Sequence, residues 1–166
     1  MDPVGYKQVN SLLNAAYMQI LKNNHLTLIE EYNAGFGGPA TTDKSDSDEC
    51  LRTWDSSQEP VGILAEAIDT GKFIWCFTEY DLGPASEGLI DVALEDNFLQ
   101  GVKAGEYFGF SVDLVNSLTN TMSMILGKPL CPELYFKAAT EKGIFYDTVD
   151  AMEANLCYAT TAQWYR

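Results

Sequence analysis

Apolar residues recur every three or four positions along residues 4–22, which is the spacing of one buried face of a helix. Pro3 suits a first helical turn and Asn23 suits a helix end, so the pattern predicts an amphipathic helix over 4–22. A second, shorter helix is expected over 26–32. The apolar stripe of the first helix comprises Tyr6, Val9, Leu13, Ala16 or Tyr17, and Ile20.

Residues 35–58 break this periodicity. They contain Gly37-Gly38-Pro39 and the polar, acidic run 41–49 (TTDKSDSDE), and both are rich in turn-forming residues. The sequence therefore predicts a linker or long surface loop over 35–58, between a helical segment 1–34 and the remainder 59–166.

A helix followed by a strand is expected next. Pro60 marks the helix start, and Gly71 follows the last apolar residue of its stripe. The run 73–77 (FIWCF) is continuously apolar and bulky, which is typical of a strand buried on both faces of a parallel sheet. A loop over 79–84 should leave the carboxyl end of that strand.

The remaining pattern alternates helices and strands. Residues 87–104 fit either a helix or a short hairpin, and then a helix is expected with Ser111 as its N-cap, Asp113 in its first turn and Gly127 at its end. A strand over 134–138, a helix over 146–154 and a strand over 156–159 complete the series. This order predicts an α/β fold with a small parallel sheet flanked by helices and right-handed crossovers.

Composition narrows the class of protein. The chain has 166 residues, 46% of them apolar, which suffices for one packed domain. Its net charge of −14 argues against nucleic-acid partners and against docking on an anionic membrane surface. No apolar run reaches the ~20 residues that a membrane helix needs, so direct membrane insertion is not expected. The first residues show no signal-peptide pattern.

The spacing of the four cysteines does not indicate a metal site. Cys50, Cys76, Cys131 and Cys157 form no C-x-x-C pair, and His25 is the only histidine. The sequence therefore predicts no metal site, no cofactor and no histidine-based catalysis. An even number of cysteines allows none, one or two disulfides. We expect Cys76 and Cys157 to be free buried thiols, because both lie in strand-like apolar runs.

Four segments together resemble a known family. They are 105–118 (GEYFGFSVDLVNSL), 127–129 (GKP), 145–152 (FYDTVDAM) and 156–166 (LCYATTAQWYR). In this order they are similar to the first lobe of bacterial extracellular solute-binding proteins of family 3, the polar amino-acid-binding type. That family has the type II periplasmic-binding-protein-like fold. The resemblance covers residues 72–166 and includes the strand over 73–77 with the loop after it.

Residues 9–33 are similar to the C-terminal helices of the same family, so the family's order is inverted here. Two explanations fit: the chain is a slice across two tandem units, or it is a circular permutation. In the family the last helices pack on the first lobe, so the N-terminal helical segment could complete one compact lobe. Because the family traps ligand between two lobes that close by a hinge, this chain would be a single-lobe form.

The resemblance implies a set of ligand-binding residues. Arg166 and Thr161 match the family's strand ending and would meet a ligand carboxylate, with Thr160 as a nearby donor. An acidic residue after the first strand, Glu79 or Asp81, would meet the ammonium group. The candidate aromatic walls are Tyr80, Phe145 and Tyr146.

Three functional hypotheses follow. The first is a non-catalytic solute-binding domain of transport or sensing type, for an amino acid or a similar small polar molecule. The family would imply an extracellular or periplasmic setting, with a second lobe, a tandem unit or a membrane transporter or receptor as partner. The second is an interaction or structural module that reuses the lobe without ligand. The third, ranked lowest, is a lyase or hydrolase derived from the fold, which would need Glu79, Asp81 or Glu141 as acid or base.

Overall fold

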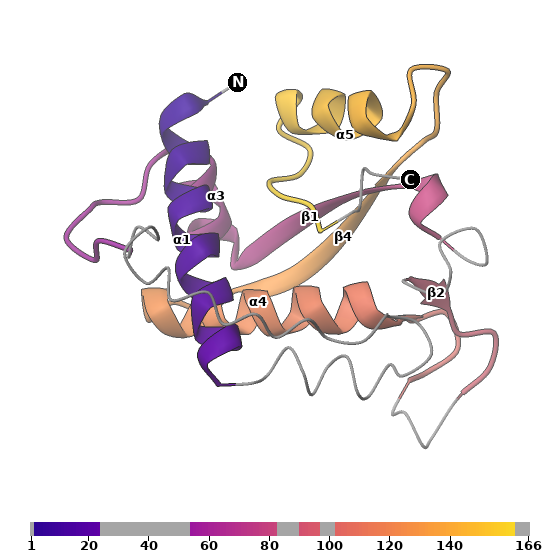
Figure 1. Cartoon of the computed structure of the whole chain (residues 1–166), viewed down its shortest axis with the longest axis horizontal. Coiled ribbons are helices and arrows are strands. Elements are labelled where there is room, and N and C mark those ends of the chain that lie inside the picture. The colour runs from indigo at the N-terminus through magenta and orange to yellow at the C-terminus, as the bar shows by residue number, and fades with distance from the viewer. Residues whose placement is uncertain (1, 24–53, 83–89, 97–101, 162–166) are drawn as a thin grey trace.

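The computed structural model describes residues 2–23, 54–82, 90–96 and 102–161. It confirms an α/β fold in which helices flank a small parallel sheet (Figure 1). The elements, in chain order, are α1 (Pro3–Lys22), α3 (Gly62–Thr70), β1 (Lys72–Thr78), the 3-10 turn η2 (Glu79–Asp81), β2 (Asp91–Val92), β3 (Tyr107–Phe108), α4 (Phe110–Leu126), β4 (Cys131–Lys137) and α5 (Ile144–Glu153).

Strand β1 is paired on both of its edges. On one edge it runs parallel to β4 along its whole length. On the other edge Trp75 pairs in parallel with Ala159, after α5. The Tyr158 N–H donates to the Ile74 carbonyl at 2.8 Å, and the Cys76 N–H donates to the Ala159 carbonyl at 2.6 Å. The third expected strand is thus a short bridged segment, and β1 lies at the centre of the sheet.

The two faces of β1 contact different helices, because successive side chains of a strand point to opposite sides. Phe73, Trp75 and Phe77 belong to the main core, with buried residues of α1, α3 and α4. Cys76 packs instead with Ala151 of α5 in a smaller cluster. Figure 1 shows α4 and α5 on opposite sides of the strands, and α1 with α3 beside the start of β1. The prediction of a strand buried on both faces is confirmed.

Helix α1 is part of this main core. Val9, Leu12, Ala16 and Ile20 are almost completely buried, and they pack with α3 and α4. The sequence predicted Leu13 on this stripe, but Leu12 occupies the buried position and Leu13 packs partly against the core. The N-terminal helix therefore completes the same compact unit as the sheet.

A single carboxylate joins the first turns of two helices. Asp2 is the N-cap of α1: its Oδ1 accepts from the Gly5 N–H at 3.0 Å, while its Oδ2 accepts from the Ile63 N–H of α3 at 3.0 Å. These backbone hydrogen bonds lower the pKa of Asp2, and the bond from the Gly5 N–H has the largest effect. A Cβ on Gly5 would lie 2.0 Å from Asp2 Oδ2, and one on Gly62 would lie 1.6 Å from it. Both glycines therefore make room for the carboxylate.

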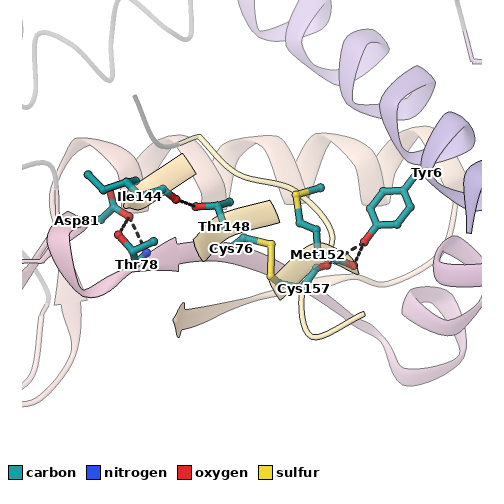
Figure 2. The surroundings of a disulfide bond; sticks show 8 residues. All are labelled: Tyr6, Cys76, Thr78, Asp81, Ile144, Thr148, Met152 and Cys157. Carbon is teal, nitrogen blue, oxygen red and sulfur yellow. Dashed lines mark hydrogen bonds between the residues drawn. A yellow bond between two sulfur atoms is a disulfide. The ribbon is translucent and has the colours of Figure 1, made fainter. Parts of the chain in front are cut away.

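Two further side chains of α1 bind backbone groups outside the helix. The Gln8 amide donates from Nε2 to the Glu59 carbonyl at 2.9 Å, and its Oε1 accepts from the Val61 N–H at 2.8 Å. The Tyr6 hydroxyl donates to the Met152 carbonyl at 2.5 Å (Figure 2). Burial raises the pKa of Tyr6 above its ordinary value. These contacts fix α1 in one orientation on the rest of the fold.

The expectation of free thiols at Cys76 and Cys157 is wrong, because the two form a disulfide (Figure 2). Both residues are fully buried, as expected. The parallel pairing of β1 with the segment after α5 brings their Cα atoms to 5.2 Å, a contact across a sequence separation of 81 that local pattern could not show. Among the described residues, Cys131 is a free and exposed cysteine.

Several element boundaries differ from the sequence expectation. Gly109, with φ of 122°, is the N-cap of α4, so Ser111 is not the cap but lies inside the helix and is buried. Strand β4 begins at Cys131 because residues 131–133 pair with the start of β1. Helix α5 begins at Ile144, two residues earlier than expected, and its buried residues are Asp147, Thr148 and Ala151.

The ambiguous segment 87–104 contains the short strand β2, which pairs antiparallel with β3 just beyond the segment, so the described part fits the hairpin alternative. The expected helix over 26–32 and most of the expected linker over 35–58 lie outside the described residues. The expected ends of two helices are confirmed, since Gly71 and Gly127 both adopt the left-handed conformation at the C-caps of α3 and α4.

We predict that replacing both Cys76 and Cys157 by alanine lowers the free energy of unfolding by about 4–5 kcal/mol, because the sequence separation of 81 makes a large loop. Urea unfolding of the oxidised protein, followed by tryptophan fluorescence, measures this. Cys131→Ala is the matched control and should change stability by less than about 0.5 kcal/mol. Equal stability of the double variant and the unmodified protein would contradict the prediction.

We also predict that Gly5→Ala destabilises the protein by about 1–3 kcal/mol, since the new Cβ would overlap the Asp2 carboxylate. An alanine inside a helix is otherwise more favourable than glycine by about 1 kcal/mol, so the sign of the effect is diagnostic. Asn10→Ala, on the exposed side of α1, is the control and should be neutral or slightly stabilising. Thermal unfolding of the unmodified protein and the two variants shows whether Gly5→Ala lowers or raises stability.

Candidate functional site

The candidate site lies at the carboxyl edge of the sheet. There β1 ends at Thr78, β4 ends at Lys137, and Thr160 and Thr161 follow the bridge at Ala159. Because all three segments run parallel, they end on the same side. Open α/β sheets bind their ligands outside the carboxyl ends of their strands, which makes this edge the place to examine.

The two acidic candidates after β1 both bind the chain's own backbone. Asp81 Oδ2 accepts from the Thr78 N–H at 2.6 Å and from the Thr78 hydroxyl at 3.1 Å, which closes the turn η2 (Figure 2). Glu79 Oε2 accepts from the Ala139 N–H at 3.2 Å, so it connects the ends of β1 and β4. The sequence placed both acids correctly beside the strand end, and their visible role is to shape this edge.

The loop between β4 and α5 is organised by a buried carboxylate that sequence reasoning did not assign to the site. Asp147 of α5 is fully buried and accepts hydrogen bonds from the Thr140 hydroxyl and, at 2.9 Å, from the Thr140 N–H. The hydroxyl of Thr140, followed by its N–H, lowers the pKa of Asp147. An acid in the first turn of a helix was visible in the sequence, but its threonine partner on the preceding loop was not.

Helices α4 and α5 both begin at a glycine N-cap, without a side-chain cap. The N-caps are Gly109 for α4 and Gly143 for α5, and neither helix has a side-chain hydrogen bond at its N-cap. Helix α5 starts from the loop that follows the carboxyl end of β4, and α4 starts on the side where β1 ends (Figure 1). The first-turn N–H groups of a helix are donors that suit an anionic group.

Thr161 has a buried polar atom. Its Oγ1 has no hydrogen-bond partner, the one such buried side-chain atom found among the described residues. Burying a hydroxyl without a partner costs about 1–3 kcal/mol, so the position suits a polar group from outside the described residues. Its neighbour Thr160 is partly buried. The third candidate of this group, Arg166, lies outside the described residues.

The three candidate aromatic residues are exposed and do not belong to the core. Tyr80 is 47% exposed, Phe145 46% and Tyr146 59%. The rings of Phe145 and Tyr146 contact edge to face, with centroids 5.3 Å apart. Tyr80 lies in the turn after β1 and the other two in the first turn of α5, so these side chains border the same carboxyl edge.

The described residues were also searched for a metal site and for a membrane-spanning helix. They contain no group of three or more His, Cys, Asp or Glu side chains placed to hold a metal ion. Searching the same residues for a helix long and apolar enough to cross a membrane gave none. Near the carboxyl edge, Lys142 forms an ion pair with Asp150 at 2.6 Å, and this hydrogen bond raises the pKa of the lysine.

A scan against protein-family models and searches of curated proteins and of solved structures found no match for this chain. The resemblance to solute-binding proteins therefore remains an interpretation of the residues.

We predict that Thr140→Val raises the pKa of Asp147 toward its ordinary value, because the hydroxyl is the main group that lowers it. A carboxyl with a lowered pKa in the folded state stabilises the fold above its unfolded pKa, and this stabilisation is lost as the pH falls through the folded pKa. Acid unfolding of the variant should therefore begin at a higher pH.

The pKa of Asp147 can be followed by NMR titration of its carboxyl carbon. Thr140→Ser keeps the hydroxyl and serves as the matched control, with a titration like that of the unmodified protein. If the pKa of Asp147 is the same in the valine and serine variants, the hydrogen bond from the Thr140 hydroxyl is not what lowers this pKa.

Proposed function

We propose that this chain is a solute-binding lobe, similar to the first lobe of family 3 extracellular solute-binding proteins, for an amino acid or a similar small polar molecule. The observation that carries the proposal is the buried, unpartnered Thr161 hydroxyl at the carboxyl edge of the sheet. The residue that the resemblance selected for carboxylate binding is thus the residue whose polar atom lacks a partner within the described chain.

A ligand carboxylate needs several hydrogen-bond donors. Thr161 offers a hydroxyl group that has no partner among the described residues, and Thr160 lies next to it in the chain. In this proposal Arg166 supplies the charged, bidentate partner. A hydroxyl donor alone would bind an anion weakly against a chain of net charge −14, so in this proposal the guanidinium is the main source of affinity.

The opposite end of an amino acid would meet the acidic turn η2. Glu79 and Asp81 each use one carboxylate oxygen for a backbone N–H. A carboxylate has about four acceptor positions, so hydrogen bonding to the chain leaves room for an ammonium donor. The exposed faces of Tyr80, Phe145 and Tyr146 would contact the ligand's aliphatic part or side chain.

One acid at this edge, Asp147, is poorly suited to acid–base catalysis. Asp81 and Asp147 accept hydrogen bonds that hold them in place, and the bonds from Thr140 lower the pKa of Asp147. A general acid or base works best with a pKa near the working pH, so a carboxyl shifted downward is poorly suited to proton transfer.

The disulfide supports an exported setting. Disulfides form and persist mainly in secreted, periplasmic and extracellular proteins, because the cytosol keeps thiols reduced. The Cys76–Cys157 bond is fully buried and joins the strands that lead to Thr78 and to Thr160. In the proposal the lobe works in transport or sensing outside the cytosol, with a second lobe, a tandem unit or a membrane transporter or receptor covering the ligand.

A second candidate function is an interaction module without ligand. The observation that favours it is the exposure of Tyr80, Phe145 and Tyr146, since aromatic side chains are enriched in protein interfaces. In that case a partner protein would cover the carboxyl edge, and the Thr161 hydroxyl would bind a group of that partner.

Isothermal titration calorimetry with a panel of amino acids, including glutamate, leucine and lysine, tests the proposal. We expect at least one of them to bind, and Thr161→Val to weaken that binding by about 10–100-fold, which is the value of a hydrogen bond to a charged group. Thr70→Val is the matched control, because Thr70 lies before β1 at the opposite edge and its hydroxyl binds the carbonyl of Glu66.

Absence of heat with every amino acid, from protein that is folded and oxidised, would overturn the solute-binding proposal. If the Thr161 and Thr70 variants lose the same affinity, Thr161 is not part of the binding site. A concentration-dependent mass in sedimentation that disappears in Tyr146→Ser would favour the interaction module.

A further inference from the structure

Helix α4 begins with backbone donors that have no acceptor among the described residues. The first N–H of this helix with a partner is that of Asp113, which donates to the Gly109 carbonyl at 3.0 Å. The N–H groups of residues 110–112 form no hydrogen bond within the described chain. At the starts of α1 and α3, by contrast, the Asp2 carboxylate accepts from a first-turn N–H of each helix.

The N-cap of α4 leaves the usual position of an acceptor empty. A serine, threonine or aspartate at an N-cap would accept a hydrogen bond from the first turn through its own side chain. Gly109 has no side chain, and its φ of 122° is a conformation that favours glycine. The turn over 110–112 therefore keeps its donors available for a group from elsewhere.

A buried hydroxyl without a partner lies in the same turn. Ser111 is 5% exposed, and its hydroxyl forms no hydrogen bond with the described residues. The residue four positions earlier is Tyr107 of β3, so the helix supplies no carbonyl there. Four buried threonines all donate from their hydroxyl to a carbonyl or a carboxylate: Thr78, Thr119, Thr121 and Thr148.

The Ser111 hydroxyl is directed toward the open turn and can be reached from solvent. The Cα–Cβ bond of a helical residue is tilted toward the N-terminus of its helix, which here is the end with the unpartnered N–H groups. Thr161 Oγ1 is the fully enclosed side-chain atom without a partner among the described residues. The small exposure of Ser111 therefore includes its oxygen, and a small molecule can approach it.

The number and charge of these donors indicate the ligand. Three N–H groups and one hydroxyl make four donors, and a carboxylate offers about four acceptor positions on its two oxygens. The start of a helix also favours a negative charge. Asp113 lies in the first turn and the chain has a net charge of −14, so a group with one negative charge fits better than a doubly charged phosphate.

We propose that the start of α4 is a binding site for one carboxylate group of a small organic acid, held by the N–H groups of residues 110–112 and by the Ser111 hydroxyl. The site uses none of the groups that the proposed amino-acid site uses. It is therefore a second anion site, and the inference stands whether or not the chain binds an amino acid at Thr161.

The site can be tested by NMR titration of the ¹⁵N-labelled, oxidised full chain with sodium acetate, with sodium chloride as the reference at equal ionic strength. We expect the amide signals of residues 110–112 to shift and to saturate with acetate but not with chloride. Ser111→Ala should raise the dissociation constant for acetate about tenfold, because a hydrogen bond to a charged group is lost. Asn116→Ala, on the exposed side of the same helix, is the matched control and should leave it unchanged.

Thermal unfolding gives a second readout. Without acetate, Ser111→Ala should melt at the same or a higher temperature than the unmodified protein, because no hydrogen bond is lost and alanine favours a helix. With acetate, the unmodified protein should gain more in melting temperature than the variant. A lower melting temperature of Ser111→Ala without acetate would show that its hydroxyl has a partner in the free protein and would overturn the proposal.

Three other results would also overturn the proposal. They are the absence of a saturable shift at residues 110–112, tighter binding of inorganic phosphate than of acetate at these residues, and loss of the shift in Thr161→Val. The last result would show that both sets of groups form one site. A failure of the amino-acid titration leaves the acetate result unaffected, so the two proposals can fail separately.

Discussion

The backbone pairing of β1 on both of its edges is the constraint on which the rest of the structure depends. A strand with β4 on one side and the segment around Ala159 on the other must be covered on both faces. Its alternating residues therefore enter two clusters, with Phe73, Trp75 and Phe77 toward the main core and Cys76 toward α5. The same pairing brings Cys157 beside Cys76 and aligns three strand ends at one edge.

At that edge, some polar groups stabilise the fold, and one has no hydrogen-bond partner among the described residues. Asp81 and Asp147 are occupied in closing the turn after β1 and the loop before α5, and each does so through a threonine. Their hydrogen bonds hold the strand end and the loop in place, which suits binding, since groups held in place lose little freedom when a ligand arrives. The Thr161 hydroxyl contrasts with them, because it is buried and has no partner among the described residues.

Helix α1 shows how a segment at one end of the chain can belong to a core built from the other end. Its attachment depends on two glycines that permit the Asp2 carboxylate to reach two helices at once. Without a Cβ at Gly5 and Gly62, the two helix starts approach closely enough to share one acceptor. The inverted order suggested by the sequence is thus compatible with a compact lobe, since packing depends on surfaces and not on chain order.

The apolar periodicity by itself determined the helices of α1, α3 and α4, the buried strand β1 and the α/β class, because these depend on spacing within a few residues. The sequence also placed Glu79, Asp81, Thr160 and Thr161 beside strand ends. Only the tertiary structure decided the Cys76–Cys157 disulfide, the partnership of Thr140 with Asp147 and the shared N-cap at Asp2. These contacts join residues that strand pairing or helix packing brings together. The local pattern of apolar and polar residues does not show which residue will be the partner.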